Sequence, residues 1–291
     1  MRYLLMLLLL WAIPVQAQWS DPQPVEITGY SGDVLDPFVL EDKLFWNDRG
    51  NGSQFGGQLN IHWASNDGDW VYEGVVFGSA YALDSFEGQV TVDGAANPFA
   101  RVYYTLPALA ADGQHIASGG WVQYGPPWPR GALHFVKRLP GDFANTLPNS
   151  FTAHPEISPD GNLLLYTQST LTDLGQREMN IAIAVRGSSG FEPGDPAILE
   201  NINTTAPETS PSMSNSTLEL FFLRLIDGGG FRIMHATRSA VDQPFDMPVV
   251  IDAIPPGVVQ IGGPAISGDT LYYHRRVGSG VELAMIKRLP E

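Results

Sequence analysis

Three carboxylates lie close to prolines that recur along the chain and could do acid–base chemistry. Asp36 directly precedes a proline, Glu156 directly follows one, and Glu208 lies three residues before one. Hydrolysis of a glycosidic bond requires two carboxyl groups across that bond, one as acid and one as base or nucleophile. If all three positions face one channel, Asp36 with Glu156 or Glu208 forms a candidate catalytic pair. The alternative is that they are polar residues at the starts of strands.

The histidines and serines of the same segments point to binding rather than to a further reaction. His154 with Glu156 and Asp36 supplies ligand types that suit a divalent cation. The six histidines show no HxH or HExxH spacing, however, so we expect no metal and no cofactor. Ser210 and Ser212 lack the GxSxG context of a hydrolase nucleophile. We therefore predict that His154 contributes to ligand binding.

An aromatic segment, residues 119–130, is richer in Trp, Tyr and Pro than any other predicted hairpin. Exposed Trp and Tyr rings on rigid loops suit flat sugar faces or the centre of a protein interface. The alternative is a loop that packs over its own sheet. The predicted ligand-binding residues are Trp121, Tyr124, Trp128, Arg49, Arg275 and His154.

A repeat of five copies must position these residues. Each copy has a residue before a proline, a small or apolar pair, a polar turn and an apolar run rich in strand formers. The copies span residues 36–46, 106–116, 154–166, 210–222 and 263–273. The proline suits the start of a strand whose first N–H needs no partner, and the polar turn suits a hairpin. Each copy therefore predicts two strands, the second buried between neighbouring sheets.

A second recurring element predicts a third strand in each unit. Its copies are residues 60–65, 133–138, 180–186, 231–238 and 282–288. Four copies are followed by an aromatic that starts an outer strand, namely Trp70, Phe143, Phe191 and Phe245. The fifth has no continuation, because the chain stops at Glu291.

This organisation predicts an all-β, five-bladed β-propeller, with about 50 residues per blade. The last blade needs an outer strand from elsewhere in the chain. Residues 21–27 echo residues 243–251, so we expect residues near Val25 to Ile27 to complete the last blade and close the ring.

The repeat resembles the WD40-like (PD40) propeller repeat of the TolB-like proteins. Residues 157–166, ISPDGNLLLY, are similar to that family's core motif, and residues 236–238 are similar to its strand ending. The resemblance covers nearly the whole mature chain and implies a non-catalytic module that binds an envelope protein or glycan through one face. TolB itself has an additional α/β domain and six blades, so its role in envelope integrity does not transfer.

A second resemblance supports an alternative function. Asp36-Pro37 resembles the Asp-Pro of five-bladed glycosidases of the arabinanase and xylosidase kind, whose Asp acts as base. It implies a carbohydrate-active hydrolase in which Glu156 or Glu208 is the second carboxylate.

The N-terminus and composition limit location and partners. Residues 1–17 combine Arg2, an apolar run and the small-x-small site Val15-Gln-Ala17, which predicts a signal peptide cleaved after Ala17. Residues 18–291 would then form one periplasmic or secreted domain. The chain has no cysteine, so disulfides and thiolate metal sites are excluded. A net charge of −15 disfavours nucleic acid and anionic lipid as partners, and no stable membrane insertion is expected after cleavage.

Overall fold

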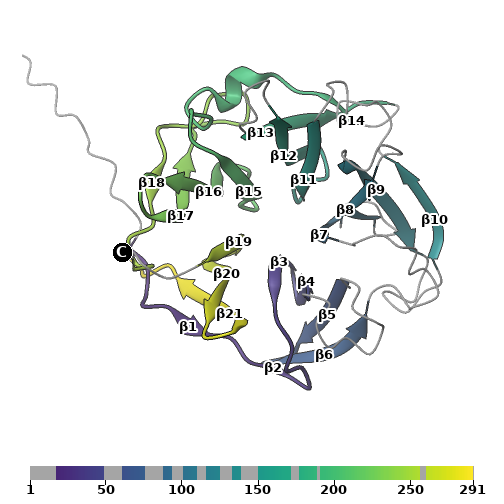
Figure 1. Ribbon diagram of the computed structural model, residues 1–291, viewed down its shortest axis with the longest axis vertical. Coiled ribbons are helices and arrows are strands. Elements are labelled where there is room, and N and C mark those ends of the chain that lie inside the picture. Colours follow the sequence, from purple (N-terminus) through teal and green to yellow (C-terminus); the bar gives the residue numbers. More distant parts are fainter. Residues whose placement is uncertain are drawn as a thin grey trace, which may run out of the picture.

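The computed structural model describes residues 18–48, 61–75, 88–93, 101–109, 116–124, 133–138, 150–171, 177–188, 191–255 and 260–290. Within residues 88–138 it describes the backbone and not the side chains. The described strands form four four-stranded sheets and one five-stranded sheet, arranged around a common centre as a β-propeller (Figure 1). No helix among these residues has the length and apolar character needed to cross a membrane.

Each sheet extends from an inner strand near the centre to an outer edge (Figure 1). The first sheet has the order β3 (Leu35–Leu40), β4 (Lys43–Asn47), β5 (Ile61–Asn66), β6 (Trp70–Val75) and β2 (Ile27–Thr28). The second has β7 (Gly88–Asp93), β8 (Arg101–Leu109), β9 (Ile116–Tyr124) and β10 (Leu133–Arg138). The third has β11 (Ser150–Ile157), β12 (Leu163–Leu171), β13 (Arg177–Arg186) and β14 (Phe191–Pro193), followed by the 3-10 helix η3 (Pro196–Leu199).

The last two sheets follow the same plan. The fourth has the order β15 (Glu208–Met213), β16 (Glu219–Ile226), β17 (Gly230–Thr237) and β18 (Val249–Val250). The fifth has β19 (Ile261–Ser267), β20 (Thr270–Val277), β21 (Gly280–Lys287) and, at its outer edge, β1 (Gln23–Pro24). Each inner strand contacts the next, from β3 through β7, β11, β15 and β19 back to β3, so the inner strands form a closed ring.

The core lies between neighbouring sheets, because second strands are buried on both faces. In β16, Leu220 and Phe222 join a cluster with residues of the third sheet. Phe221 and Leu223 face the other way and join a cluster with residues of the fifth sheet. Successive side chains of a strand point to opposite faces, so an uninterrupted apolar run is what such a strand requires. This is why the runs predicted from sequence coincide with β4, β12, β16 and β20.

The second sheet differs from the prediction. The Pro-containing copy at residues 106–116 was expected to begin on the inner strand. Instead Leu106-Pro107 lies in β8, second from the centre, and the inner position is taken by Gly88–Asp93, which carries no proline. The expected third strand at residues 133–138 becomes the outer strand, β10. The unit therefore contains an additional strand at its start that the repeat did not reveal.

The N-terminal segment completes the fifth sheet. Gln23 and Pro24 pair with Met285 and Ala284 of β21. In the fourth sheet, Val249 and Val250 pair in the same way with His235 and Met234 of β17. Flanking hydrogen bonds repeat the register: the Ser20 N–H donates to the Lys287 carbonyl at 2.8 Å, as the Asp246 N–H does to the Thr237 carbonyl at 2.7 Å. The chain start thus occupies the place that an outer strand occupies in the fourth sheet.

The expected position of this strand, Val25 to Ile27, was wrong by about two residues. Val25 still donates its N–H to the Leu283 carbonyl at 2.9 Å. Ile27 has already left the fifth sheet and pairs in parallel with Trp70 of the first sheet. The segment therefore bonds to β21 through residues 19–25 and to β6 through residues 27–28, and so joins the last sheet to the first.

In the fifth sheet Trp19 supplies the aromatic ring that contacts an arginine, as Phe191 and Phe245 do in the third and fourth sheets. In the fourth sheet the Arg238 guanidinium lies 4.5 Å from the centre of the Phe245 ring, and in the third Arg186 lies 4.6 Å from Phe191. In the fifth sheet Arg288 lies 5.3 Å from the Trp19 ring. Trp19 also packs edge-on against Phe221 of the fourth sheet, with ring centres 6.0 Å apart. The first residues of the described chain therefore reproduce both the pairing and the arginine–aromatic contact of an outer strand.

We expect Trp19→Ala to destabilise the protein by about 2 kcal/mol, since a partly buried indole and its cation–π contact are both removed. The matched control is Glu26→Ala, which changes an exposed side chain in the same segment. Thermal unfolding followed by circular dichroism measures both variants. Equal midpoints for the two would show that Trp19 has no part in closing the ring.

Candidate active site

A repeated backbone distortion brings four residues to the centre. Asp36, His154, Ser210 and Gly263 each precede a proline in an inner strand, and each has a left-handed φ of 47°, 50°, 53° and 52° respectively. The pairing of each inner strand with its neighbour shifts register at this point. A residue before proline is disfavoured in the right-handed helical region, and a bulge redirects the side chain. The prolines predicted from sequence therefore mark bulges rather than only strand starts.

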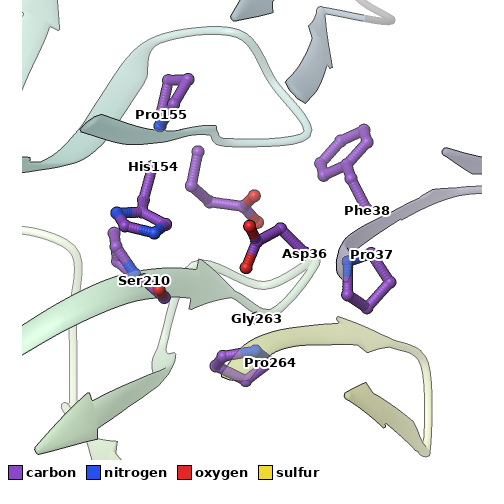
Figure 2. A pocket seen from close by; sticks show the side chains of 10 residues that line it. Asp36, Pro37, Phe38, His154, Pro155, Ser210, Gly263 and Pro264 are labelled. Atoms are coloured by element: carbon purple, nitrogen blue, oxygen red, sulfur yellow. The ribbon is translucent and has the colours of Figure 1, made fainter. Parts of the chain in front are cut away.

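These residues line one small cavity on the axis, with a volume of about 30 Å³. Its walls come from four sheets and comprise Asp36, Pro37, Phe38, His154, Pro155, Glu156, Ser210, Pro211, Gly263 and Pro264. Figure 2 shows the Asp36 side chain extending from β3 across the cavity toward the side that carries His154 and Ser210. The volume has room for about two water molecules.

Two glycines of the fifth sheet make the approach of Asp36 possible. A Cβ on Gly263 would lie 2.5 Å from the Asp36 Cα and 3.0 Å from its Oδ1. A Cβ on Gly262 would lie 2.2 Å from Cε1 of His274, the residue opposite it on β20. The sequence Gly262-Gly263 thus leaves space for the His274 ring and for the Asp36 carboxylate.

His274 fixes the Asp36 backbone. The Asp36 N–H donates to His274 Nδ1 at 2.9 Å, across 238 residues of sequence. Because a backbone amide can only donate, Nδ1 must be unprotonated and the imidazole neutral. The 3.7 Å separation between Nδ1 and Asp36 Oδ1 is therefore not an ion pair in this state. His274 was not predicted from the sequence, because it belongs to no motif and acquires its role only when the fifth sheet meets the first.

Glu156 is the second carboxyl in the cavity wall and is only 8% exposed. Its Oε1 accepts hydrogen bonds from the Ser212 hydroxyl and the Met213 N–H, both at 3.2 Å. Burial raises the pKa of Glu156 to about 8, an effect that these two hydrogen bonds partly oppose. The group is therefore protonated at neutral pH and can deliver a proton.

His154 is a partly buried neighbour of Asp36. Burial lowers the pKa of His154 below its usual value, and the Asp36 carboxylate opposes this shift. Neutral His154 is therefore the dominant form at pH 7. Its Nδ1 lies 3.2 Å from the Thr209 hydroxyl oxygen.

Glu208 does not join the other two carboxylates, contrary to one sequence-based expectation. It lies outside the cavity wall and is fully buried. Its Oε1 accepts from Arg224 Nε at 2.8 Å and from the Thr204 hydroxyl at 2.6 Å, and its Oε2 accepts from the Thr204 N–H at 3.1 Å. These contacts attach the loop before β15 to β16, so Glu208 has a structural role. Removing one partner of such a buried pair is costly to stability.

The remaining predicted binding residues do not gather at the cavity in the described part of the chain. Arg275 donates from Nε to Glu282 at 2.8 Å on the neighbouring strand. Trp121 and Tyr124 lie on β9, where side chains are not described, and Trp128 and Arg49 lie outside the described residues. The described residues contain no group of three or more histidine, cysteine or acidic side chains that could hold a metal.

Comparison with known proteins places the fold. No protein-family model matches the sequence, and no curated protein matches it. The solved structures that are similar over most of the chain include the following three. A thermostable family-43 glycoside hydrolase has a TM-score of 0.55 and 16% identity, with 94% of this chain and 93% of that chain covered. The catalytic domain of a GH62 α-L-arabinofuranosidase from Coprinopsis cinerea has a TM-score of 0.54 and 11% identity, with 94% and 97% covered. An exo-β-1,3-galactanase from Phanerochaete chrysosporium has a TM-score of 0.53 and 11% identity, with 91% and 63% covered.

At these identities the likeness shows a shared β-propeller fold. It also corrects the expected relationship: the prediction of a TolB-like, PD40-type binding or scaffold module was wrong. Four of the structures that match nearly the whole chain with TM-scores above 0.5 are glycoside hydrolases. The short motif at residues 157–166 reflects a turn between two propeller strands, which different propeller classes can share.

The close approach of Asp36 to the fifth sheet can be tested with two glycines. Gly263 and Gly268 have nearly equal left-handed φ values, 52° and 55°, so alanine at either position has a similar backbone cost of about 1 kcal/mol. A Cβ on Gly268 meets nothing within 4 Å, whereas one on Gly263 meets the Asp36 backbone. In urea unfolding we expect Gly263→Ala to be less stable than Gly268→Ala by about 2 kcal/mol. Equal destabilisation would contradict the packing of Asp36 against Gly263.

Proposed function

We propose that this protein is a glycoside hydrolase built on a five-bladed propeller. Each of the five sheets is one blade, and the N-terminal segment completes the last. Asp36 is the base or nucleophile and Glu156 is the general acid. The observation that carries the proposal is that Asp36 and the buried Glu156 line the same axial cavity.

The two carboxyls differ in the way that this chemistry requires. Glu156 is shielded from water and keeps its proton at neutral pH, because burial disfavours its charged form. It can therefore protonate the leaving oxygen of a glycosidic bond. Asp36 lines the same cavity, where its carboxylate can activate a water molecule or attack the anomeric carbon. Pairs of carboxyls with different protonation states divide the acid and base roles in this way.

The size of the cavity limits which part of a substrate enters it. A volume of about 30 Å³ is too small for a sugar ring but accommodates the reacting oxygen atoms. We therefore place the glycosidic oxygen and the attacking water at the axis, with the rings above it. The expected partner is a neutral glycan outside the cytoplasm, reached after removal of the signal peptide.

Hydrolysis of a panel of aryl glycosides and of arabino-, xylo- and galacto-oligosaccharides tests this function. We expect activity on at least one substrate, and a loss of at least about 100-fold in kcat for both Asp36→Asn and Glu156→Gln. The rate should fall as the pH rises through about 8, because Glu156 then loses the proton that it must donate.

The matched control is Asp227→Asn, which changes an exposed carboxylate in the turn between β16 and β17 and should leave kcat within about twofold. Full activity in Asp36→Asn would remove Asp36 from the chemistry. Failure of every glycoside in the panel would contradict the proposed reaction class.

A further inference from the structure

A chain of hydrogen bonds between the third and fourth sheets ends at His154. The Ser210 N–H lies 3.1 Å from the Thr167 hydroxyl oxygen, which lies 3.0 Å from the Thr209 hydroxyl oxygen. The Thr209 oxygen lies 3.2 Å from His154 Nδ1. Both threonines are buried, with Thr167 at 0% exposure and Thr209 at 4%. The catalytic roles proposed above do not use this chain.

The direction of the chain is fixed by its first member. A backbone N–H can only donate, so Thr167 accepts from Ser210. Among the residues that the structure describes, Thr209 is the remaining partner of the Thr167 hydroxyl, and an unsatisfied hydroxyl proton at full burial is costly. Thr167 therefore donates to Thr209, and Thr209 in turn donates to His154 Nδ1.

We infer that Ser210, Thr167 and Thr209 hold His154 as the tautomer protonated on Nε2, so that His154 serves the axial cavity as a hydrogen-bond donor. Thr209 is then a positioning residue that acts through His154. Independently, burial lowers the pKa of His154, which agrees with a neutral ring.

The inferred tautomer specifies what the cavity recognises. His154 Nε2–H and the protonated Glu156 are donors, whereas the Asp36 carboxylate is an acceptor. A hydroxyl group both donates and accepts, so it satisfies this mixed set. An anionic group would instead meet the Asp36 charge. The recognition of a sugar hydroxyl rests on the proposed function, whereas the tautomer of His154 does not.

Nitrogen NMR of the ¹⁵N-labelled protein tests the tautomer directly, without substrate. Long-range ¹H–¹⁵N spectra at pH 7 should show His154 with a protonated Nε2 and an unprotonated Nδ1, its signals being identified by their loss in His154→Asn. Thr209→Val removes the donor and should give a mixture of tautomers, whereas Thr209→Ser keeps the hydroxyl and should restore the original spectrum. Thr237→Val, at an exposed threonine on β17, is the control and should change nothing.

A doubly protonated His154, a proton on Nδ1, or an unchanged spectrum in Thr209→Val would overturn the inference. If Thr209→Val fails to fold, the wild-type spectrum still decides, and Thr167→Val interrupts the chain one step earlier. For any substrate that the protein hydrolyses, Thr209→Val should lower kcat/KM by about tenfold. This is the change expected from the loss of one hydrogen bond in the transition state. An inactive protein with the expected spectrum would contradict the glycosidase proposal and leave the tautomer established.

Discussion

The attachment of residues 18–36 to the last sheet is the constraint on which the rest of the structure depends. Gln23 and Pro24 pair with β21, and Trp19 pairs with Arg288 directly after it. Asp33 Oδ1 accepts the Val281 N–H at 2.7 Å, and the Val34 N–H donates to the Val281 carbonyl at 3.1 Å. The next residues are the Asp36 bulge, whose N–H is held by His274. One continuous segment therefore both closes the ring and delivers Asp36 to the axis. The site can form only when the two ends of the chain have met, which makes its geometry a consequence of closure.

The bulges before proline explain why functional groups gather at the centre. Asp36, His154 and Ser210 hold left-handed φ values that cost non-glycine residues of order 1 kcal/mol each, and such strain persists only where the surrounding structure enforces it. The enforcing contacts are visible. Asp36 is held by His274, and Ser210 by the Thr167 hydroxyl. The fourth position is Gly263, where a side chain would collide with Asp36. Three polar side chains and one glycine thus share a cavity that four large side chains would fill.

The sequence predicted the strands well, because the runs in β12, β16 and β20 must be apolar on both faces and the turns between them use residues suited to hairpins. The predicted closing strand was two residues too late, because residues 21–27 were matched to residues 243–251 by their sequence alone. The register instead follows the hydrogen bond of Ser20 and the contact between Trp19 and Arg288. The sequence did not show which of Glu156 and Glu208 lines the cavity. Both lie near a recurring proline, and only the register at the bulge decides between them. Local sequence carried no signal for His274, whose partner is distant along the chain. The resemblance to TolB-like repeats was misleading, because a short turn motif is common to propellers with different chemistry.

The proposed chemistry depends on a protonated Glu156 in the cavity that Asp36 also lines. The most direct test is a ¹³C NMR titration of the side-chain carboxyls in the folded protein, with Glu156→Gln identifying the signal of Glu156. We expect a midpoint near 8, far above the ordinary value of 4.5, because burial disfavours the charged form. Since the folded state then keeps a proton that the unfolded chain has lost, stability should also decline as the pH rises from about 4.5 to about 8. A Glu156 signal that titrates near 4.5 would contradict the role of Glu156 as general acid, because Glu156 would then have no proton to donate at neutral pH.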